Sequence, residues 1–262
     1  MRSKSPWYGF LAFLLLGLSC HGKLVQNKPD LILAVASSLR LPCEQILAAF
    51  ETESGLDVGL VSASSGVLTA QIKQGAPFDV FLSANEAYPA ALYAAGLSFD
   101  APKVFTYGQL YFWTKNDLHP KEFISGRLIR DSKDVHIAIA SPELAPYGMA
   151  AQSWLQKRGY WVKVQSSLIY AENVGQVNQY IYAQAVQAAF SSNSAAFAPP
   201  LSTHGHWHPL PDSPRLPHFG LFIGNPTPTA QLLFTYLQGS TAQQILRQSG
   251  FLPTKNPQST DH

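Results

Sequence analysis

The sequence predicts an α/β protein of two lobes, each with a mainly parallel sheet flanked by helices. Short apolar runs alternate with amphipathic helical patterns along most of the chain, which is typical of parallel strands connected by helices. The alternation forms two series, one before and one after the apolar segment 104–113. The length of 262 residues, with 46% hydrophobic and 13% charged residues, suits about two packed domains and excludes a disordered chain.

Strands are expected where a short apolar run lies between turn signals. The first series contains strands at 31–36, 57–62 and 79–83. The second contains strands at 136–140, 165–170 and 186–190, and a last strand is expected at 219–223. Helices are expected between and after these strands, among them 89–95, 147–157, a helix starting near 174, 228–239 and 241–248.

The first 20 residues are typical of an export signal. Arg2 and Lys4 precede the apolar run 10–18, which is too short to span a bilayer. Cys20 lies where the acylated cysteine of a lipoprotein would be, whereas Gly17 stands three residues earlier, where leucine is usual. We therefore expect an exported protein with a signal peptide over 1–20, and lipid attachment at Cys20 remains open.

The helix that follows the first strand has a clear apolar face. Cys43, Ile46, Leu47 and Phe50 are spaced i, i+3, i+4 and i+7, which places them on one stripe of the helix. Pro42 falls in the first turn, where its missing N–H has no intrahelical partner to lose. Cys43 is therefore expected to be a packed core thiol rather than a reactive one.

Polar turns follow four of the predicted strands. Ligands of open parallel sheets bind at the carboxyl ends of the strands, where the next helix begins. A helix N-terminus there offers free backbone N–H groups and the positive end of the helix dipole, which together suit a fully ionised tetrahedral oxyanion. The turns are Ser37-Ser38, Ser64-Ser65-Gly66, Pro146-Tyr147-Gly148 and Glu172-Asn173-Val174-Gly175.

None of these turns contains lysine or arginine, so neutral donors are expected to hold the anion. Each turn taken alone also fits an ordinary helix cap, since serine, asparagine and glycine are common there. Four such turns after strands in both halves of the chain favour a shared anion site.

At these residues the sequence resembles the periplasmic molybdate- and tungstate-binding proteins of ABC transporters, which are type II solute-binding proteins. The likeness covers about 31–252. Its motifs, in chain order, are Ala34-Val35-Ala36-Ser37-Ser38-Leu39, Ala63-Ser64-Ser65-Gly66, Gly75-Ala76-Pro77-Phe78-Asp79-Val80-Phe81-Leu82-Ser83-Ala84, Ala145-Pro146-Tyr147-Gly148 and Ala171-Glu172-Asn173-Val174-Gly175-Gln176.

The resemblance implies a periplasmic-binding-protein fold with the ligand in the cleft between the lobes. The first lobe would comprise 29–107 and 220–255 and the second 108–219, with crossover segments near 106–110 and 218–221 acting as hinges. It also implies a periplasmic monomer that captures molybdate or tungstate, uses no cofactor and delivers the ligand to an inner-membrane ABC permease.

The resemblance further implies which residues bind the anion. From the first lobe, Ser38 and Ser65 would offer hydroxyl and amide donors, and Ser37 would add another. From the second lobe, Tyr147 would offer donors and Val174 its backbone N–H. The same implied chemistry leaves another oxyanion, such as sulfate, as an alternative ligand.

A divalent metal site is a second hypothesis. His204, His206 and His208 alternate and would share one face of a strand. However, the surrounding segment 199–217 contains six prolines, which predict irregular structure instead.

Two further classes of function find no support in the sequence. An enzyme is not expected, because the nucleophile elbow, the dinucleotide fingerprint, the P-loop and the zinc-protease motif are all missing from the sequence. Nucleic acid is not an expected partner either. Removal of the signal leaves 16 of the 18 basic residues against 16 acidic ones, so there is no excess of positive charge for a phosphate backbone.

Overall fold

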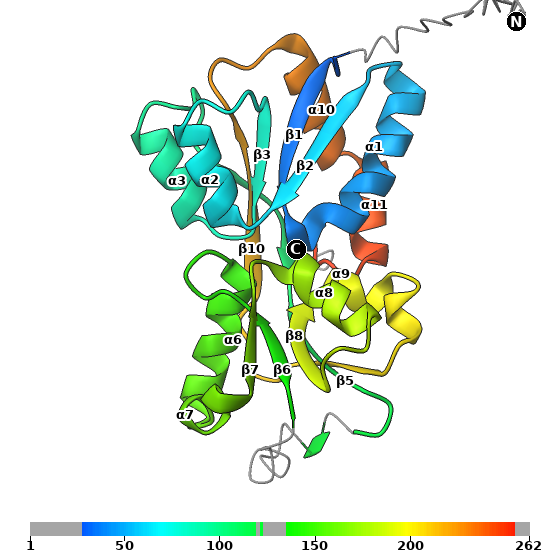
Figure 1. Cartoon of the computed structure of the whole chain (residues 1–262). Coiled ribbons are helices and arrows are strands. Elements are labelled where there is room, and N and C mark those ends of the chain that lie inside the picture. The colour runs from blue at the N-terminus through cyan, green and yellow to red at the C-terminus, as the bar shows by residue number, and fades with distance from the viewer. Residues whose placement is uncertain (1–27, 119–120, 123–134, 255–262) are drawn as a thin grey trace, which may run out of the picture.

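The computed structural model describes residues 28–118, 121–122 and 135–254. Within these residues the chain forms two lobes that contact each other (Figure 1). Each lobe contains a five-stranded sheet covered by helices on both faces. The signal peptide predicted for 1–20, with Cys20, lies outside the described residues. Among the described helices, none has the length and apolar character of a membrane-spanning segment.

The first lobe is built on a sheet with strand order β2-β1-β3-β10-β4. β1 pairs in parallel with β2 and β3, while β10 runs antiparallel to β3 and β4. Four strands therefore point the same way, as predicted. Their bounds are Leu31–Ala36 (β1), Val58–Ala63 (β2), Val80–Ser83 (β3), Lys103–Gly108 (β4) and Leu216–Phe222 (β10).

Helices pack on both faces of this sheet because the side chains of β1 alternate. Leu33 and Val35 face α1, α10 and α11, whereas Ala34 faces α2 and α3 (Figure 1). Cys43 lies buried in the first of these clusters, where burial raises the pKa of its thiol to about 12. The helices are α1 Arg40–Ser54, preceded by the 3-10 turn Ser37–Leu39, α2 Ser65–Lys73, α3 Ala87–Ala94, α10 Pro228–Gln238 and α11 Ser240–Gln248.

The second lobe repeats this plan with strand order β7-β6-β8-β5-β9. β6 pairs in parallel with β7 and β8, and β5 runs antiparallel to β8 and β9. The strands are Leu110–Thr114 (β5), Ile137–Ala140 (β6), Leu168–Ala171 (β7), Ala188–Ser192 (β8) and His206–Pro209 (β9). The helices are α6 Pro146–Lys157, α7 Trp161–Val164, α8 Val174–Tyr182 and α9 Asn193–Phe197.

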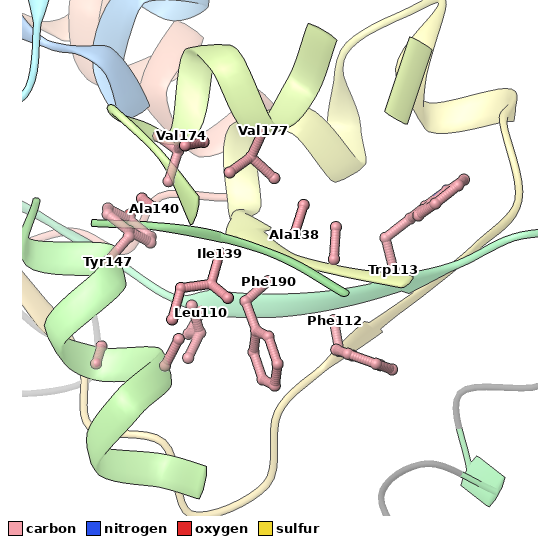
Figure 2. Packing of buried hydrophobic residues seen from close by; sticks show 14 of the residues in the cluster. Leu110, Phe112, Trp113, Ala138, Ile139, Ala140, Tyr147, Val174, Val177 and Phe190 are labelled. Atoms are coloured by element: carbon pink, nitrogen blue, oxygen red, sulfur yellow. The ribbon is translucent and has the colours of Figure 1, made fainter. Parts of the chain in front are cut away.

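The core of the second lobe lies on both sides of its sheet. Figure 2 shows Val174 and Val177 of α8 on one side of the strands, with Leu110 and Phe190 on the other. Tyr147, at the start of α6, belongs to the same cluster and is 2% exposed. Tyr147 and Val174 thus lie at the end of this core that is next to the first lobe.

Two local predictions were wrong. Segment 199–217 was expected to be irregular, but His206–Pro209 forms β9 at the edge of the second sheet, where proline at the strand end is tolerated. The strand expected at 165–170 begins only at Leu168, because the polar residues Gln165–Ser167 form a 3-10 turn.

The chain changes sheet twice, at Gln109 between β4 and β5 and again between Pro209 and Leu216. The first crossing lies in the predicted hinge segment 106–110. Residues 218–221 lie within β10. The division into lobes at 107/108 and 219/220 remains a prediction.

Candidate functional site

A small cavity lies where the two lobes meet, and all five predicted anion-binding residues line it. Its volume is about 10 Å³, which is room for about one water molecule. The lining residues are Ala36, Ser37, Ser38, Ser64, Ser65 and Ala84 from the first lobe and Ala145, Pro146, Tyr147 and Val174 from the second.

The cavity is surrounded by the starts of helices. Ser65 and Val174 are the first residues of α2 and α8, and Tyr147 is the second residue of α6. The backbone N–H of each of these residues has no acceptor within its own helix, and each stands at the positive end of a helix dipole. The lining therefore combines hydrogen-bond donors with a positive potential.

At the start of α2, neighbouring residues have different partners. The Val67 N–H donates to Ser64 Oγ over 3.3 Å, and the Gly66 N–H donates to the Leu144 carbonyl of the other lobe over 3.0 Å. Ser65 Oγ accepts a hydrogen bond from the Ala84 N–H over 3.2 Å. The hydroxyl proton of Ser65 thus remains to be donated to an acceptor in the cavity.

The start of α8 is held in place by its own cap. The Gln176 N–H donates to Asn173 Oδ1 over 3.2 Å, and the Glu172 N–H donates to Gln176 Oε1 over 2.7 Å. Asn173 satisfies a backbone group deeper in the first turn and leaves the N–H of Val174, which is 2% exposed, to serve the cavity. The binding role predicted for the Val174 N–H remains a prediction.

Ser38 and Tyr147 also contact a buried polar cluster behind the cavity. Ser38 Oγ lies 3.1 Å from His218 Nε2, and the Tyr147 hydroxyl donates to Asn193 Oδ1 over 3.2 Å. Burial raises the pKa of Tyr147 above its usual range, partly offset by a hydrogen bond with Ser38. Burial lowers the pKa of His218 to about 4, so this ring is neutral near pH 7.

The cavity lining, within the described part of the chain, contains no ionisable side chain other than the Tyr147 phenol. A guanidinium group lies nearby in a larger groove of about 400 Å³ between α1 and α8, to which Ser37 also contributes. This group belongs to Arg40, whose side chain is 55% exposed and pairs with Glu44 over 2.8 Å. Arg40 is therefore outside the cavity lining, and the groove that contains it shares only Ser37 with the cavity.

The two lobes are in contact across the cleft. Besides the Gly66 N–H bond to Leu144, Ser194 Oγ donates to the Ser38 carbonyl over 2.7 Å, and both atoms are buried. Asn193 Nδ2 donates to the Ser249 carbonyl over 3.0 Å. The structure therefore describes a closed arrangement of the lobes.

Sequence reasoning missed three polar residues of this region: Asn193, Ser194 and His218. Asn193 and Ser194 follow β8, so the rule that identified the other turns, polar residues after a predicted strand, applied to them as well. His218 lies inside β10, 180 residues from Ser38, and no spacing in the sequence connects the two.

The three histidines proposed as a metal site do not converge. His204 Nδ1, His206 Nε2 and His208 Nδ1 each contact a different backbone carbonyl, those of Pro200, Asn116 and Pro209. In the regions that the structure describes, no three histidine, cysteine, aspartate or glutamate residues are grouped to hold a metal ion.

Comparisons with known proteins agree with this geometry. A family model described as bacterial extracellular solute-binding protein matches residues 31–252. The chain is 29% identical over 224 residues to the molybdate-binding protein ModA of Azotobacter vinelandii, covering 83% of this chain and 88% of that protein. It is 32% identical over 153 residues to the protein of the same name from Rhodobacter capsulatus, covering 58% and 59%.

Among solved structures, the chain is similar to the periplasmic molybdate-binding protein of Azotobacter vinelandii. The TM-score is 0.79 at 25% identity, and the match covers 86% of this chain and 100% of that one. The likeness thus includes both lobes and the cleft between them.

Proposed function

The chain belongs to the family of bacterial extracellular solute-binding proteins, and from this premise we propose that it captures molybdate or tungstate in the cleft between its lobes. Its relatives are solute-binding and molybdate-binding proteins, and the chain is not an enzyme. The observation that supports the choice of an oxyanion most directly is the set of helix N-termini from both lobes around one cavity with no cationic side chain in its lining.

The ligand's chemistry matches these donors. Molybdate and tungstate are tetrahedral dianions near neutral pH, and their oxygens only accept hydrogen bonds. The backbone N–H groups of Ser65, Tyr147 and Val174, with the Ser65 hydroxyl, offer donors from two lobes. Fixed neutral donors stabilise such an anion without a counter-charge.

We infer that binding involves hinge motion of the lobes. Room for about one water is too small for a five-atom anion, so the lobes must separate for the ligand to enter and must close less tightly around it. We propose the groove that contains Arg40, which shares Ser37 with the cavity, as the route by which the ligand enters. Sulfate and phosphate have shorter bonds to oxygen and would reach fewer of the donors at once.

The remaining parts of the proposal concern the protein's place in the cell. The export signal predicted for 1–20 and the family both favour a periplasmic or cell-envelope protein, with a lipid anchor at Cys20 still open. We propose that the monomeric, ligand-loaded protein docks on the membrane permease of an ABC transporter. No cofactor enters this function.

Calorimetry with molybdate, tungstate, sulfate and phosphate tests the proposal. We expect tight binding of one or both of the first two anions and weak or no binding of the others. Binding should also raise the melting temperature, since a ligand at 100 times its Kd stabilises the folded state by about 2.7 kcal/mol. No heat and no melting shift with molybdate or tungstate at millimolar concentration would exclude both ions. Tight binding of zinc that is lost on changing His204, His206 and His208 would favour the metal alternative.

A further inference from the structure

The hydrogen bonds around His218 determine which of its ring nitrogens carries the proton. His218 Nδ1 lies 2.9 Å from the Leu216 carbonyl oxygen, and the ring is fully buried. A carbonyl oxygen only accepts, so Nδ1 must be the donor. Because the ring is neutral near pH 7, its other nitrogen, Nε2, has a lone pair and no proton.

The partner of that lone pair is the Ser38 hydroxyl. Ser38 Oγ lies 3.1 Å from Nε2, and since Nε2 only accepts, Ser38 is the donor in this pair. The single hydroxyl proton of Ser38 is therefore directed at the histidine and away from the cavity. Ser38 itself is 1% exposed, so bulk solvent does not compete for this proton.

The same analysis holds for Tyr147, which lies across the cavity. Asn193 Oδ1 accepts from the Gln109 N–H over 3.0 Å, while Asn193 Nδ2 donates to the Ser249 carbonyl. These two bonds fix the orientation of the amide, so Oδ1 is also an acceptor for the Tyr147 hydroxyl. His218 Nε2 is thus the acceptor for the Ser38 proton, while Asn193 Oδ1 and the Ser38 oxygen, with which Tyr147 also shares a hydrogen bond, are acceptors for the Tyr147 proton.

The tight packing of β4 against these side chains indicates that their hydrogen-bonded arrangement is fixed by the fold. A Cβ atom at Gly108 would collide with the Tyr147 hydroxyl, would lie 2.7 Å from His218 Cε1 and would lie 3.2 Å from Asn193 Oδ1. The backbone of Gly108 therefore approaches the cluster as closely as glycine allows, which leaves little room for the rings to move.

We propose that His218 is a positioning residue that retains the hydroxyl proton of Ser38, so that Ser38 serves the bound oxyanion through its backbone N–H rather than through its side chain. This inference rests on the proposed function for its effect on the anion, although the proton's location is a property of the protein alone.

The strengths of the competing bonds explain why the anion does not draw the proton away. A hydrogen bond to an ion is roughly twice as strong as one between neutral groups. Turning the hydroxyl toward the anion, however, breaks the bond to His218 and leaves Nε2 buried without a partner, which costs about as much as the charge-assisted bond gains. The side chain of Ser38 therefore adds little net affinity while His218 is present.

A set of variants tests this on the full chain, with molybdate and tungstate as probes. Ser38→Ala should change the Kd by less than about threefold, in contrast to Ser65→Ala. His218→Phe frees the Ser38 hydroxyl to donate to the anion and should tighten binding by about tenfold. The double variant, which combines Ser38→Ala with His218→Phe, should lose this gain. His218→Gln, whose amide oxygen can replace Nε2 as acceptor, should bind like the unchanged protein.

A spectroscopic measurement on the unchanged, ligand-free protein is independent of folding defects and of the ligand. Long-range proton–nitrogen NMR spectra should show the His218 proton on Nδ1 and a bare Nε2. A proton on Nε2 would overturn the inference, as would a loss on Ser38→Ala equal to that on Ser65→Ala. Weakening by His218→Phe that persists in the double variant would also overturn it. If the unchanged protein binds neither anion, the proposed function fails, and so does the effect assigned to Ser38.

Discussion

Ser64 and Ser65 are neighbours with the same side chain, and the structure assigns them different tasks. Ser64 Oγ accepts from the Val67 N–H and so caps α2. Ser65 Oγ accepts from the Ala84 N–H, which orients its hydroxyl proton toward another acceptor. Both side chains are buried, so removal of either oxygen leaves a backbone donor without its partner. Either change should therefore destabilise the fold, whereas only the change at Ser65 also removes a hydroxyl donor from the cavity.

We expect Ser65→Ala to weaken molybdate binding by about 1.5–3 kcal/mol, because a donor to a buried anion is lost. Ser64→Ala should lower the free energy of unfolding by about 1 kcal/mol through loss of the cap and should change the Kd much less. Calorimetry and urea unfolding of both variants make the comparison. Equal changes in Kd for the two variants would mean that Ser65 is only a second structural serine.

The candidate site was predictable from the sequence to the extent that its residues follow strands. Ser37, Ser38, Ser65, Tyr147 and Val174 all come after predicted strands, and all line the cavity. Their identity as molybdate-binding residues came from the resemblance and remains a prediction. His218 was not predictable, since it lies within β10 and meets Ser38 only because the fold places the last strand of the first sheet beside the cleft.

At the scale of elements, the site depends on how the helices begin. α8 and α10 are capped in the same way, by Asn173 and Thr227, whose side chains accept from the N–H three residues later. Only α8 starts at the cavity. Matched changes at the two caps can therefore distinguish helix stability from ligand binding.

Asn173→Ala and Thr227→Ala should each destabilise the fold by about 1 kcal/mol. Asn173→Ala should in addition weaken molybdate binding, because the first turn of α8 would no longer hold the Val174 N–H in place. Thr227→Ala should leave the affinity unchanged. Thermal unfolding with and without molybdate, together with calorimetry, measures both quantities. Unchanged affinity in the Asn173 variant would show that the start of α8 does not contribute to the site.

The elements themselves were largely predictable because most strands here are continuous apolar runs between clear turns. β1 was predicted with its observed bounds, and β2 within one residue. β9 was missed because the six prolines of 199–217 outweighed the alternation of His206 and His208. It is a half-exposed edge strand formed by pairing with β5. Tertiary pairing of this kind overrides local propensity.

At the scale of the whole molecule, the lobes close through contacts of their own. The Gly66 N–H bond to Leu144 and the Ser194 hydroxyl bond to the Ser38 carbonyl both cross the cleft. A Cβ atom at Gly66 would lie 2.9 Å from the Leu144 oxygen and 3.2 Å from its Cα. The closed arrangement of the lobes described above therefore leaves no room for a side chain at this position.

Gly66→Ala should therefore keep the fold and oppose closure. Alanine suits the first turn of α2, so the melting temperature without ligand should not fall. Molybdate affinity should drop by about 1–3 kcal/mol, from the lost bond and the steric contact. Small-angle scattering at saturating molybdate should show a larger radius of gyration than for the unchanged protein. Ser65→Ala serves as control, since it should still close. Equal compaction of both variants would contradict a role for Gly66 in closure.

The position of β10 between β3 and β4 also has a consequence for how the chain reaches this fold. Among the strands that the structure describes, β4 has β10 as its one partner in the first sheet, yet more than 100 residues of sequence separate the two strands. β4 can therefore pair only after β10, near the end of the chain, has been synthesised. The strands of the second lobe all lie within the segment between β4 and β10. As the chain emerges in sequence order, the second lobe can complete its sheet first, and the first lobe closes its sheet last.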